Sequence, residues 1–359
     1  MNSTKQQGES AGALRVVVIG AGLIGTSIAL GVKRSGGLVE LIDTDGRAAA
    51  LANDLVEMAE VVTDPDLVVI ATPTGALFGV IERYKSLYAK STFIDIGSTK
   101  TKVAVDVLNS EMERRFCPTH PMAGRELDGA EAAQSDLFVG KSWVITPLAG
   151  CSESSIEVTK RLIEILGARV IQMTPEDHDA AVAAVSHLPQ VISSLLASQL
   201  IDESPDHLTI AGSGIADTTR IAGSNPELWR EILTLNHEAL LPLLKRYESD
   251  LKRLIETSNY EEILVNGRKG RQLLPGKHRS SVRDYIHLPV VLEDKPNQLA
   301  ALFNECAKIN VNVEDIKIEH SPEQETGLVV LALSPENASK LQSHLASNSW
   351  RVHPPRSEK

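Results

Sequence analysis

Four side chains that could do chemistry stand among apolar residues, prolines and glycines. Ser98 follows a predicted strand, His120 lies in a turn rich in proline and glycine, and His187 lies mid-helix beside a proline. Arg220 precedes a second long helix. Imidazoles exchange protons near neutral pH, and a guanidinium binds carboxylates in a two-pronged geometry. The set suits a polar, anionic substrate, although a lone histidine is often structural and Ser98 could cap a helix, with or without a role in catalysis.

A glycine-rich turn predicts dinucleotide binding. Gly20, Gly22 and Gly25 are spaced as G-x-G-x-x-G, directly after an apolar strand and at the start of a helix. Leu23 and Ile24 complete the turn. The glycines permit a tight turn and let backbone N–H groups reach a pyrophosphate at the helix N-terminus.

An acid at the end of the next strand supports the same prediction. Asp43 lies about 20 residues beyond the turn, where this fold places the residue that binds the adenosine ribose. A carboxylate there repels a 2′-phosphate, so we expect NAD as the cofactor in preference to NADP. Arg47 weakens that preference because it could reach such a phosphate.

Alternating strands and helices must position these groups. Six short apolar runs are typical of strands buried on both faces of a parallel sheet. They cover residues 14–20, 38–43, 66–72, 92–97, 142–147 and 168–173. With helical stretches between them, they predict an α/β fold: a doubly wound, Rossmann-type dinucleotide-binding domain over residues 12–173. Ser98 then lies at the carboxyl end of a strand, where ligands bind in such sheets.

The pattern changes to an all-helical second domain over residues 174–267. Long helices are predicted over 176–201 and 225–254. Residues 180–201 carry no charge and could span a membrane by length, but their polar residues favour a helix buried on all sides in a protein interior. Two long apolar helices in so small a unit predict burial against a second copy, and hence a homodimer.

The C-terminal part is predicted to be a linker followed by a small domain. Residues 268–283 hold six Lys or Arg and no acid. We expect a solvated basic linker, with an anion-binding patch as the alternative. Beyond it, strands and helices in the order β-α-β-β-α-β predict a ferredoxin-like domain over residues 284–356.

Composition excludes several classes of protein. The 359-residue chain has 47 acidic side chains against 36 Lys and Arg, a formal net charge of -11, which argues against nucleic acid as a partner. Cys117, Cys151 and Cys306 are far apart, which excludes a disulfide framework and a four-cysteine zinc site. We predict no metal, no membrane partner and, because the N-terminus lacks an apolar signal-peptide segment, a cytoplasmic location.

Six segments together resemble the prephenate/arogenate dehydrogenase family of tyrosine biosynthesis. They are GAGLIGTS at Gly20, ATPT at Ala71, DIGSTK at Asp95, HPMAGRE at His120, SHLPQ at Ser186 and TRIAGSNPELW at Thr219. The HPMAG and SHLPQ segments are specific to this family, and the match covers residues 12–265. The resemblance implies NAD-dependent oxidative decarboxylation of prephenate to 4-hydroxyphenylpyruvate, with arogenate as the alternative substrate.

The resemblance also implies roles for individual residues. His120 matches the family's catalytic histidine and would accept the hydroxyl proton of the substrate, while Ser98 would orient that hydroxyl. Arg220 would hold a substrate carboxylate. The further pocket residues would be His187, Glu126, Ser224 and Trp229, and the ATPT segment would contact the cofactor through Thr72 and Pro73.

Two departures from the family pattern bear on specificity and regulation. Gln190 stands where many relatives have histidine, so the choice between prephenate and arogenate stays open. The tail from Tyr285 resembles an ACT domain, for which L-tyrosine is the expected effector. The residues matching its effector site are Asp294, Pro296, Asn297 and Leu299, with Asn297 where glycine is usual.

Two other functions compete with this one. A sensor that binds a dinucleotide and an amino acid without catalysis would leave Ser98 and His120 idle. A 3-hydroxyacid dehydrogenase shares the two-domain plan but would need a catalytic lysine in the helical domain, and the uncharged stretch 180–201 offers none.

Overall fold

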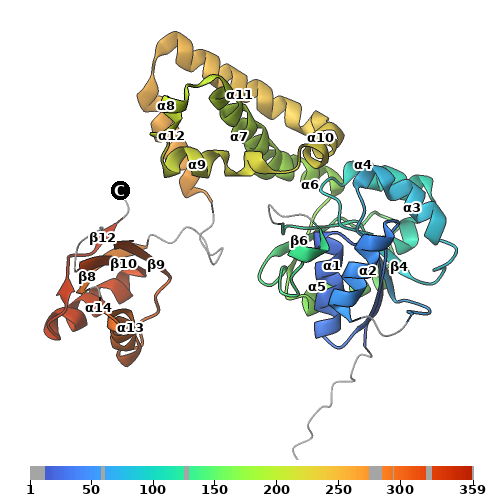
Figure 1. Cartoon of the computed structure of the whole chain (residues 1–359), viewed down its shortest axis with the longest axis horizontal. Helices are drawn as coiled ribbons and strands as arrows, with labels where there is room; N and C mark the ends of the chain where they lie inside the picture. The colour runs from blue at the N-terminus through green and yellow to red at the C-terminus, as the bar shows by residue number, and fades with distance from the viewer. Residues whose placement is uncertain are drawn as a thin grey trace, which may run out of the picture. The chain divides into compact units, whose positions relative to one another are not determined.

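The computed structural model describes residues 13–57, 61–124, 129–274, 285–293, 295–320 and 326–357. The chain divides into two compact units, residues 1–250 and residues 251–359. The first unit combines a sheet-and-helix part with a helical part, and the second contains a separate sheet (Figure 1).

A four-stranded parallel sheet forms the centre of the first unit. Its spatial order is β2-β1-β3-β4. The strands are β1 (Arg15–Ile19), β2 (Leu38–Ile42), β3 (Leu67–Ile70) and β4 (Thr92–Asp95). The helices are α1 (Leu23–Arg34), α2 (Gly46–Val56), α3 (Leu77–Tyr84), α4 (Thr101–Asn109) and α5 (Glu153–Ile165).

Helices cover both faces of this sheet, as expected for a doubly wound fold. Val16 and Val18 of β1 point into one core, which they share with apolar residues of α1, α2 and α5. Val17 and Ile19 point into a second core with residues of α3 and α4. Successive strand residues face opposite sides, so a strand with apolar residues at every position needs a helical layer on each face.

Three more strands extend the layer. Strands β5 (Thr119–Pro121), β6 (Ser142–Ile145) and β7 (Arg169–Gln172) pair in that order, β5 antiparallel to β6 and β6 parallel to β7. A bridge between Phe93 and Phe116 links this sheet to β4. The prediction that His120 lies in a turn was wrong: it is the central residue of β5, a strand that two prolines concealed.

The helical part of the first unit follows β7. Its helices are α6 (Pro175–Val182), α7 (Leu188–Ser198), α8 (Pro205–Leu208), α9 (Ser213–Thr219), α10 (Pro226–Leu235) and α11 (His237–Thr257), of which α11 ends in the second unit. A π-helical turn, Ala183–His187, joins α6 to α7. Pro189 in the first turn of α7 has no N–H and cannot donate the regular helical hydrogen bond to the preceding turn. The wider π-helical turn lies directly before it, where that bond is missing.

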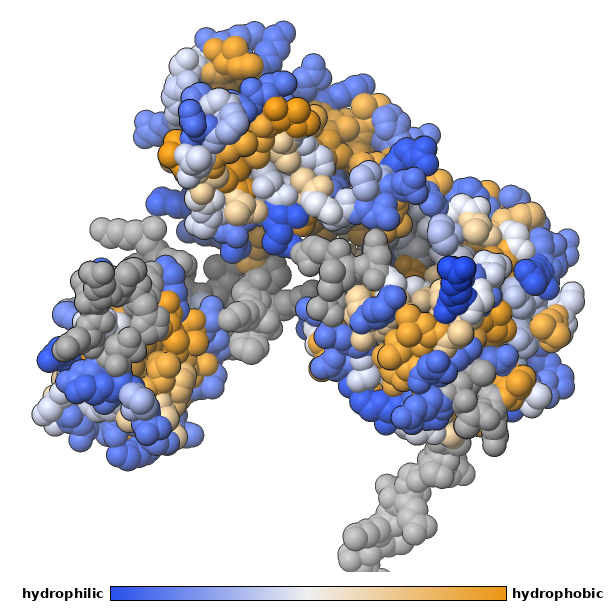
Figure 2. Space-filling model, in the orientation of Figure 1, coloured by the Kyte–Doolittle hydropathy of each residue, from blue (hydrophilic) through white to orange (hydrophobic). Residues whose placement is uncertain are grey.

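The predicted burial of this helical stretch on all sides was wrong. Residues Pro175–Asp202 form one helical run long and apolar enough to cross a membrane. Only 28% of the most apolar 18-residue stretch of this run is buried, however. Val185, Leu195 and Ile201 are 65%, 55% and 82% exposed. Figure 2 shows hydrophobic residues on the surface of the helical region.

The second unit begins with the end of α11 and with α12 (Tyr260–Gln272). Residues 268–272, predicted to open the linker, are therefore helical. An antiparallel sheet with the order β11-β8-β10-β9 follows. Its elements are β8 (Ile286–Glu293), α13 (Gln298–Lys308), β9 (Asp315–His320), β10 (Thr326–Leu333), α14 (Pro335–Ser347), β11 (Arg351–Val352) and β12 (Arg356–Ser357), which pairs with β8.

Candidate active site

The glycine turn between β1 and α1 has two glycines that the fold itself requires. Gly20 has a φ of +119°, and a Cβ there would lie 2.3 Å from the Ala71 carbonyl oxygen. A Cβ on Gly25 would lie 2.1 Å from the Gly20 carbonyl oxygen. In contrast, a Cβ on Gly22 would meet nothing within 4 Å. Packing explains Gly20 and Gly25, while Gly22 leaves open the space that a pyrophosphate needs.

Neighbouring polar groups fit a dinucleotide as well. One carboxylate oxygen of Asp43 accepts a hydrogen bond from the Ala21 N–H at 2.6 Å, and the other from the Asp45 N–H at 2.8 Å, so the side chain is held against the turn. The Thr72 hydroxyl oxygen is buried and has no hydrogen-bond partner among the described residues. Buried polar atoms normally have partners, and a bound cofactor would supply one. Leu23 and Ile24 follow the glycine turn as the first residues of α1. Pro73 lies three residues beyond the end of β3.

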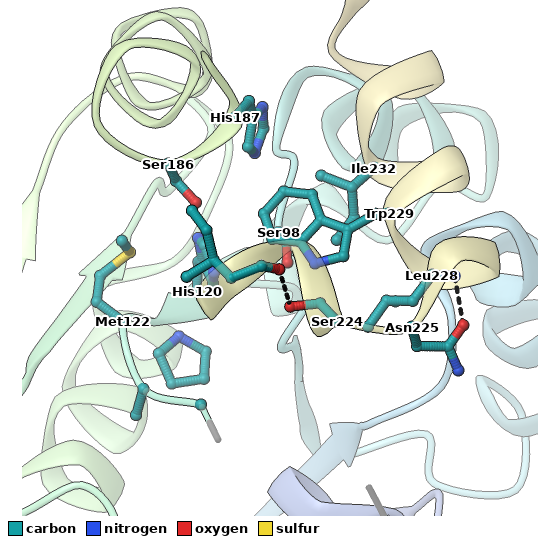
Figure 3. Close-up of a pocket in the computed structure, with 14 residues that line it drawn as sticks. Ser98, His120, Met122, Ser186, His187, Ser224, Asn225, Leu228, Trp229 and Ile232 are labelled. Atoms are coloured by element: carbon teal, nitrogen blue, oxygen red, sulfur yellow. Dashed lines mark hydrogen bonds between the residues drawn. The ribbon is translucent and has the colours of Figure 1, made fainter. Parts of the chain in front are cut away.

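A cavity of about 380 Å³ lies between the sheet-and-helix part and the helical part of the first unit. Ser98 and His120 border it from the first part, and His187, Ser224 and Trp229 from the second (Figure 3). The sequence therefore identified five residues that the fold brings to one cavity. The other residues around it are mostly apolar: Pro121, Met122, Ala123, Gly124, Ser186, Ile221, Asn225, Leu228 and Ile232.

A chain of hydrogen bonds runs from His120 away from the cavity. Its Nδ1 lies 2.9 Å from Nε2 of His178, and Nδ1 of His178 lies 2.8 Å from a carboxylate oxygen of Asp179. The carboxylate can only accept, so His178 donates from Nδ1, and a neutral His178 has its lone pair at Nε2. His120 then donates from Nδ1. Its own Nε2 is left as an acceptor, which is what a general base needs.

The surroundings keep His120 neutral. Burial, followed by the nearby His178 and Lys100, lowers the pKa of His120 well below its ordinary value. His187, across the cavity, lies edge-on to Trp229 with ring centroids 6.0 Å apart. Burial is also the main reason that the pKa of His187 falls to about 4. Near neutral pH both imidazoles are therefore uncharged.

Asp179 is held by more than His178. Its carboxylate accepts the backbone N–H groups of Lys100 and Thr101 at 2.7 and 2.8 Å, which lie at the start of α4. Burial alone would raise the pKa of Asp179, but these hydrogen bonds and that of His178 lower it. The alternative role of Ser98 as a helix cap is wrong, because α4 starts at Thr101 and its N–H groups bond to Asp179 instead.

A buried ion pair fixes the strand ends around Ser98 and His120. The Lys100 ammonium is fully buried, pairs with Asp95 and donates to the Thr119 carbonyl oxygen at 2.6 Å. Asp95 also accepts hydrogen bonds from the N–H groups of Gly97 and Thr119. The pair thus ties the end of β4 to β5 through Gly97 and Thr119, the direct neighbours of Ser98 and His120 in the sequence.

Three predicted residues are not placed around the cavity. Arg220 is exposed in the 3₁₀ turn Arg220–Gly223, although the next residue, Ile221, borders the cavity. Glu126 lies outside the described residues. Gln190 is buried and donates to the Ile221 carbonyl oxygen at 3.0 Å, so it supports the cavity wall from behind.

His178 and Asp179 were not predicted from the sequence. They lie in the first turns of α6, behind Thr174 and Pro175, where acidic residues ordinarily indicate helix capping. Their buried position, 1% and 3% exposed, was the missing information. The sequence signal that could have indicated their buried position is a His-Asp pair directly after the acidic residues Glu176 and Asp177 of the first turn.

A second cavity, of about 340 Å³, lies in the second unit between β8, β10 and the start of α13. Pro296, Asn297 and Leu299 border it, whereas Asp294 lies outside the described residues. Asn297 has a φ of +70°, the left-handed conformation that asparagine tolerates and that explains why glycine is usual there.

The fold and the first cavity define a class of protein: a two-part NAD-dependent dehydrogenase, with a dinucleotide-binding sheet and a helical part that closes the substrate site. Family models agree in detail. The nucleotide-binding domain of prephenate dehydrogenase matches residues 28–172, and its dimerization domain matches residues 174–266. The chain therefore belongs to the prephenate dehydrogenase family of NAD-dependent oxidoreductases.

Individual relatives support the same assignment. Cyclohexadienyl dehydrogenase of Zymomonas mobilis is 32% identical over 67% of this chain and 86% of its own. Prephenate dehydrogenase of Bacillus subtilis is 26% identical over 90% of this chain and 93% of its own. The crystal structure of prephenate dehydrogenase from A. aeolicus with hydroxyphenyl propionate and NAD+ is 30% identical, with a TM-score of 0.67 over 73% of this chain and 98% of that one.

Proposed function

We propose that the protein catalyses the NAD-dependent oxidative decarboxylation of prephenate to 4-hydroxyphenylpyruvate and carbon dioxide. The observation that carries the proposal is the chain Asp179–His178–His120, which leaves an acceptor nitrogen on a neutral imidazole at the cavity. A base of this kind is needed because the substrate loses a hydroxyl proton as its carbonyl forms. NAD, when bound, accepts the hydride from the ring carbon that bears this hydroxyl.

The protein's own groups divide the remaining work. Nε2 of His120 takes the hydroxyl proton, and the Ser98 hydroxyl holds the same oxygen in line with it. Loss of the ring carboxylate as carbon dioxide follows because it makes the ring aromatic. Mostly apolar walls exclude water, so the developing charge is stabilised by few, fixed groups. Arg220, beside Ile221 at the cavity wall, is the proposed partner of a substrate carboxylate.

Replacing His120 by Asn tests the assignment. His120→Asn should bind NAD normally and lose turnover of prephenate by about 100-fold or more, because asparagine cannot act as the base. Titration of NAD by fluorescence checks the first point and the rate of NADH formation the second. Turnover at the wild-type rate would exclude His120 as the base.

Arogenate is the second candidate substrate, because it differs from prephenate only in carrying an amino group where prephenate has a keto group. Gln190 favours neither: it is directed to the Ile221 carbonyl and Ser194, and does not border the cavity. Rates with each substrate, each with NAD and NADP, decide between them. A higher kcat/KM for arogenate would reassign the physiological substrate while leaving the chemistry unchanged.

We further propose that residues 284–356, the part of the second unit that contains the sheet, form an ACT-like regulatory domain that binds L-tyrosine in the 340 Å³ cavity. The β-α-β-β-α-β order and the left-handed Asn297 support this. The same assay with and without tyrosine tests it.

A cytoplasmic homodimer fits the three unpaired cysteines and the exposed apolar side chains of the helical part.

A further inference from the structure

Asn236 is a buried polar residue at the junction of α10 and α11. It is 4% exposed and stands between Leu235 and His237, where one helix ends and the next begins. Its side-chain nitrogen, Nδ2, lies 2.8 Å from the backbone carbonyl oxygen of Asp179 and 3.0 Å from Nδ1 of His187. One amide group thus joins the helix junction to α6 and to the cavity wall.

These two contacts determine where the proton of His187 resides. A carbonyl oxygen can only accept, so the Asn236 atom facing Asp179 must be the nitrogen and not the oxygen. That nitrogen carries two hydrogens. One goes to the carbonyl, and the other is directed at Nδ1 of His187, which must accept it. A neutral His187 then carries its proton on Nε2, the ring nitrogen left for the cavity that the side chain borders (Figure 3).

We propose that Asn236 is a positioning residue that makes His187 a hydrogen-bond donor to a carboxylate or carbonyl oxygen of the substrate. The identity of the substrate rests on the proposed function, but the position of the proton does not. His120 and His187 then play opposite roles at the cavity. His120 accepts the proton of the substrate hydroxyl, whereas His187 donates a hydrogen bond to a substrate oxygen that carries no proton.

Asp179 controls both histidines. Its carboxylate acts through His178 on His120, and its backbone carbonyl acts through Asn236 on His187. Among the groups that act on the pKa of His187, Asp179 favours the imidazolium and His178 opposes it; His120, across the cavity, also interacts with His187. Burial outweighs the attraction of Asp179 and holds the pKa of His187 at about 4, so the donor is uncharged near neutral pH.

NMR of the ring nitrogens tests the proton position without any substrate. The full-length protein is labelled with ¹⁵N in its histidine rings, and the His187 signals are identified by their loss in His187→Gln. At pH 7 the wild type should show a protonated Nε2 and an unprotonated Nδ1. A protonated Nδ1 in the wild type would overturn the proposal, whether or not the protein turns over prephenate.

Kinetics test the consequence for substrate binding. Asn236→Ala should raise the KM for prephenate about tenfold or more, the effect of losing a hydrogen bond to a charged group, with a smaller change in kcat. Ser193→Ala is the matched control: Ser193 is about as buried as Asn236, but its hydroxyl donates to the Thr218 carbonyl oxygen and not to a histidine. Its KM should stay within about twofold of the wild type.

A double variant separates positioning from mere structural support. In His187→Gln the glutamine amide nitrogen takes the place of Nε2 and can donate a hydrogen bond to the substrate regardless of Asn236. Adding Asn236→Ala in this background should therefore raise KM by less than about twofold. An equal increase in both backgrounds would show that Asn236 only supports the fold and would reject the proposal. Absence of any prephenate turnover in the wild type would instead contradict the proposed function and leave the NMR result to decide on Asn236.

Discussion

At the scale of single residues, the structure makes Asp179 the centre of the candidate site although it never borders the cavity. Its carboxylate orients His178 and receives the first N–H groups of α4. Removing its charge while keeping its shape should therefore change the tautomer of His120. In Asp179→Asn, an amide nitrogen in place of Oδ1 loses the bond that Oδ1 accepts from the Lys100 N–H and donates to Nδ1 of His178, which then carries its proton on Nε2. His120 then presents a proton, not a lone pair, to the substrate.

Asp179→Asn should lower kcat by about 100-fold to 10,000-fold, the range for removing general-base catalysis or its orienting carboxylate. Asp177→Asn is the control, because Asp177 is exposed on the same helix and loses the same charge. NAD affinity should be unchanged in both. A kcat of Asp179→Asn within threefold of the wild type would show that His178 and Asp179 do not set the state of His120.

The wild-type pH profile belongs to the same argument. The pKa of His120 is lowered mainly by burial, so its neutral form persists below the ordinary histidine value of about 6.5. The acid limb of kcat/KM should accordingly lie below pH 6.5 and be lost with His120→Asn.

At the scale of elements, the glycine turn separates the demands of folding from those of binding. The Gly25 position cannot hold a Cβ because the Gly20 carbonyl lies 2.1 Å away, whereas the Gly22 position is open. Gly25→Ala should therefore destabilise the fold by about 1–3 kcal/mol. Gly22→Ala should cost about 1 kcal/mol or less but weaken NAD binding about tenfold or more, because the methyl group occupies pyrophosphate space.

Thermal unfolding and NAD titration of both variants check this prediction. The two variants serve as controls for each other, since each adds one methyl group to the same turn. If Gly22→Ala bound NAD as the wild type does, the pyrophosphate would have to lie elsewhere.

The elements that the sequence predicted and those it did not differ in length and regularity. The six apolar runs were recognised because each alternates with a helix and has apolar residues on both faces. β5 has only three residues, and each of them is a proline or lies next to one, so no periodicity could identify it. The π-helical turn before Pro189 was equally hidden, because a proline predicts disruption of a helix but not its form.

The site shows the same limit. Ser98, His120 and His187 were predicted from their residue types and neighbours. His178 and Asp179 were missed because their role depends on α6 packing against β5 and α4, which is a property of the folded chain. The exposed position of Arg220 was likewise unpredictable from the sequence around it.

At the scale of the whole molecule, the exposed apolar side chains of the helical part favour assembly. Replacing Leu195 and Ile201, 55% and 82% exposed, by Asp should convert a dimer into monomers of 38.8 kDa. Leu87→Asp is the control: Leu87 is 67% exposed but lies in the sheet-and-helix part. Light scattering after gel filtration measures both masses. Dimers that persist in the double variant would place the interface on another surface.

The edge-on contact of Trp229 with His187 has an optical consequence. The chain has three tryptophans, and they are distributed one to each part: Trp143 in the buried core of the sheet, Trp229 at the cavity and Trp350 against the core of the second unit. Keeping one indole and replacing the other two by phenylalanine would give three separate fluorescent reporters. Each would signal one process in the intact enzyme: unfolding of the nucleotide-binding part, filling of the cavity, or changes in the C-terminal unit.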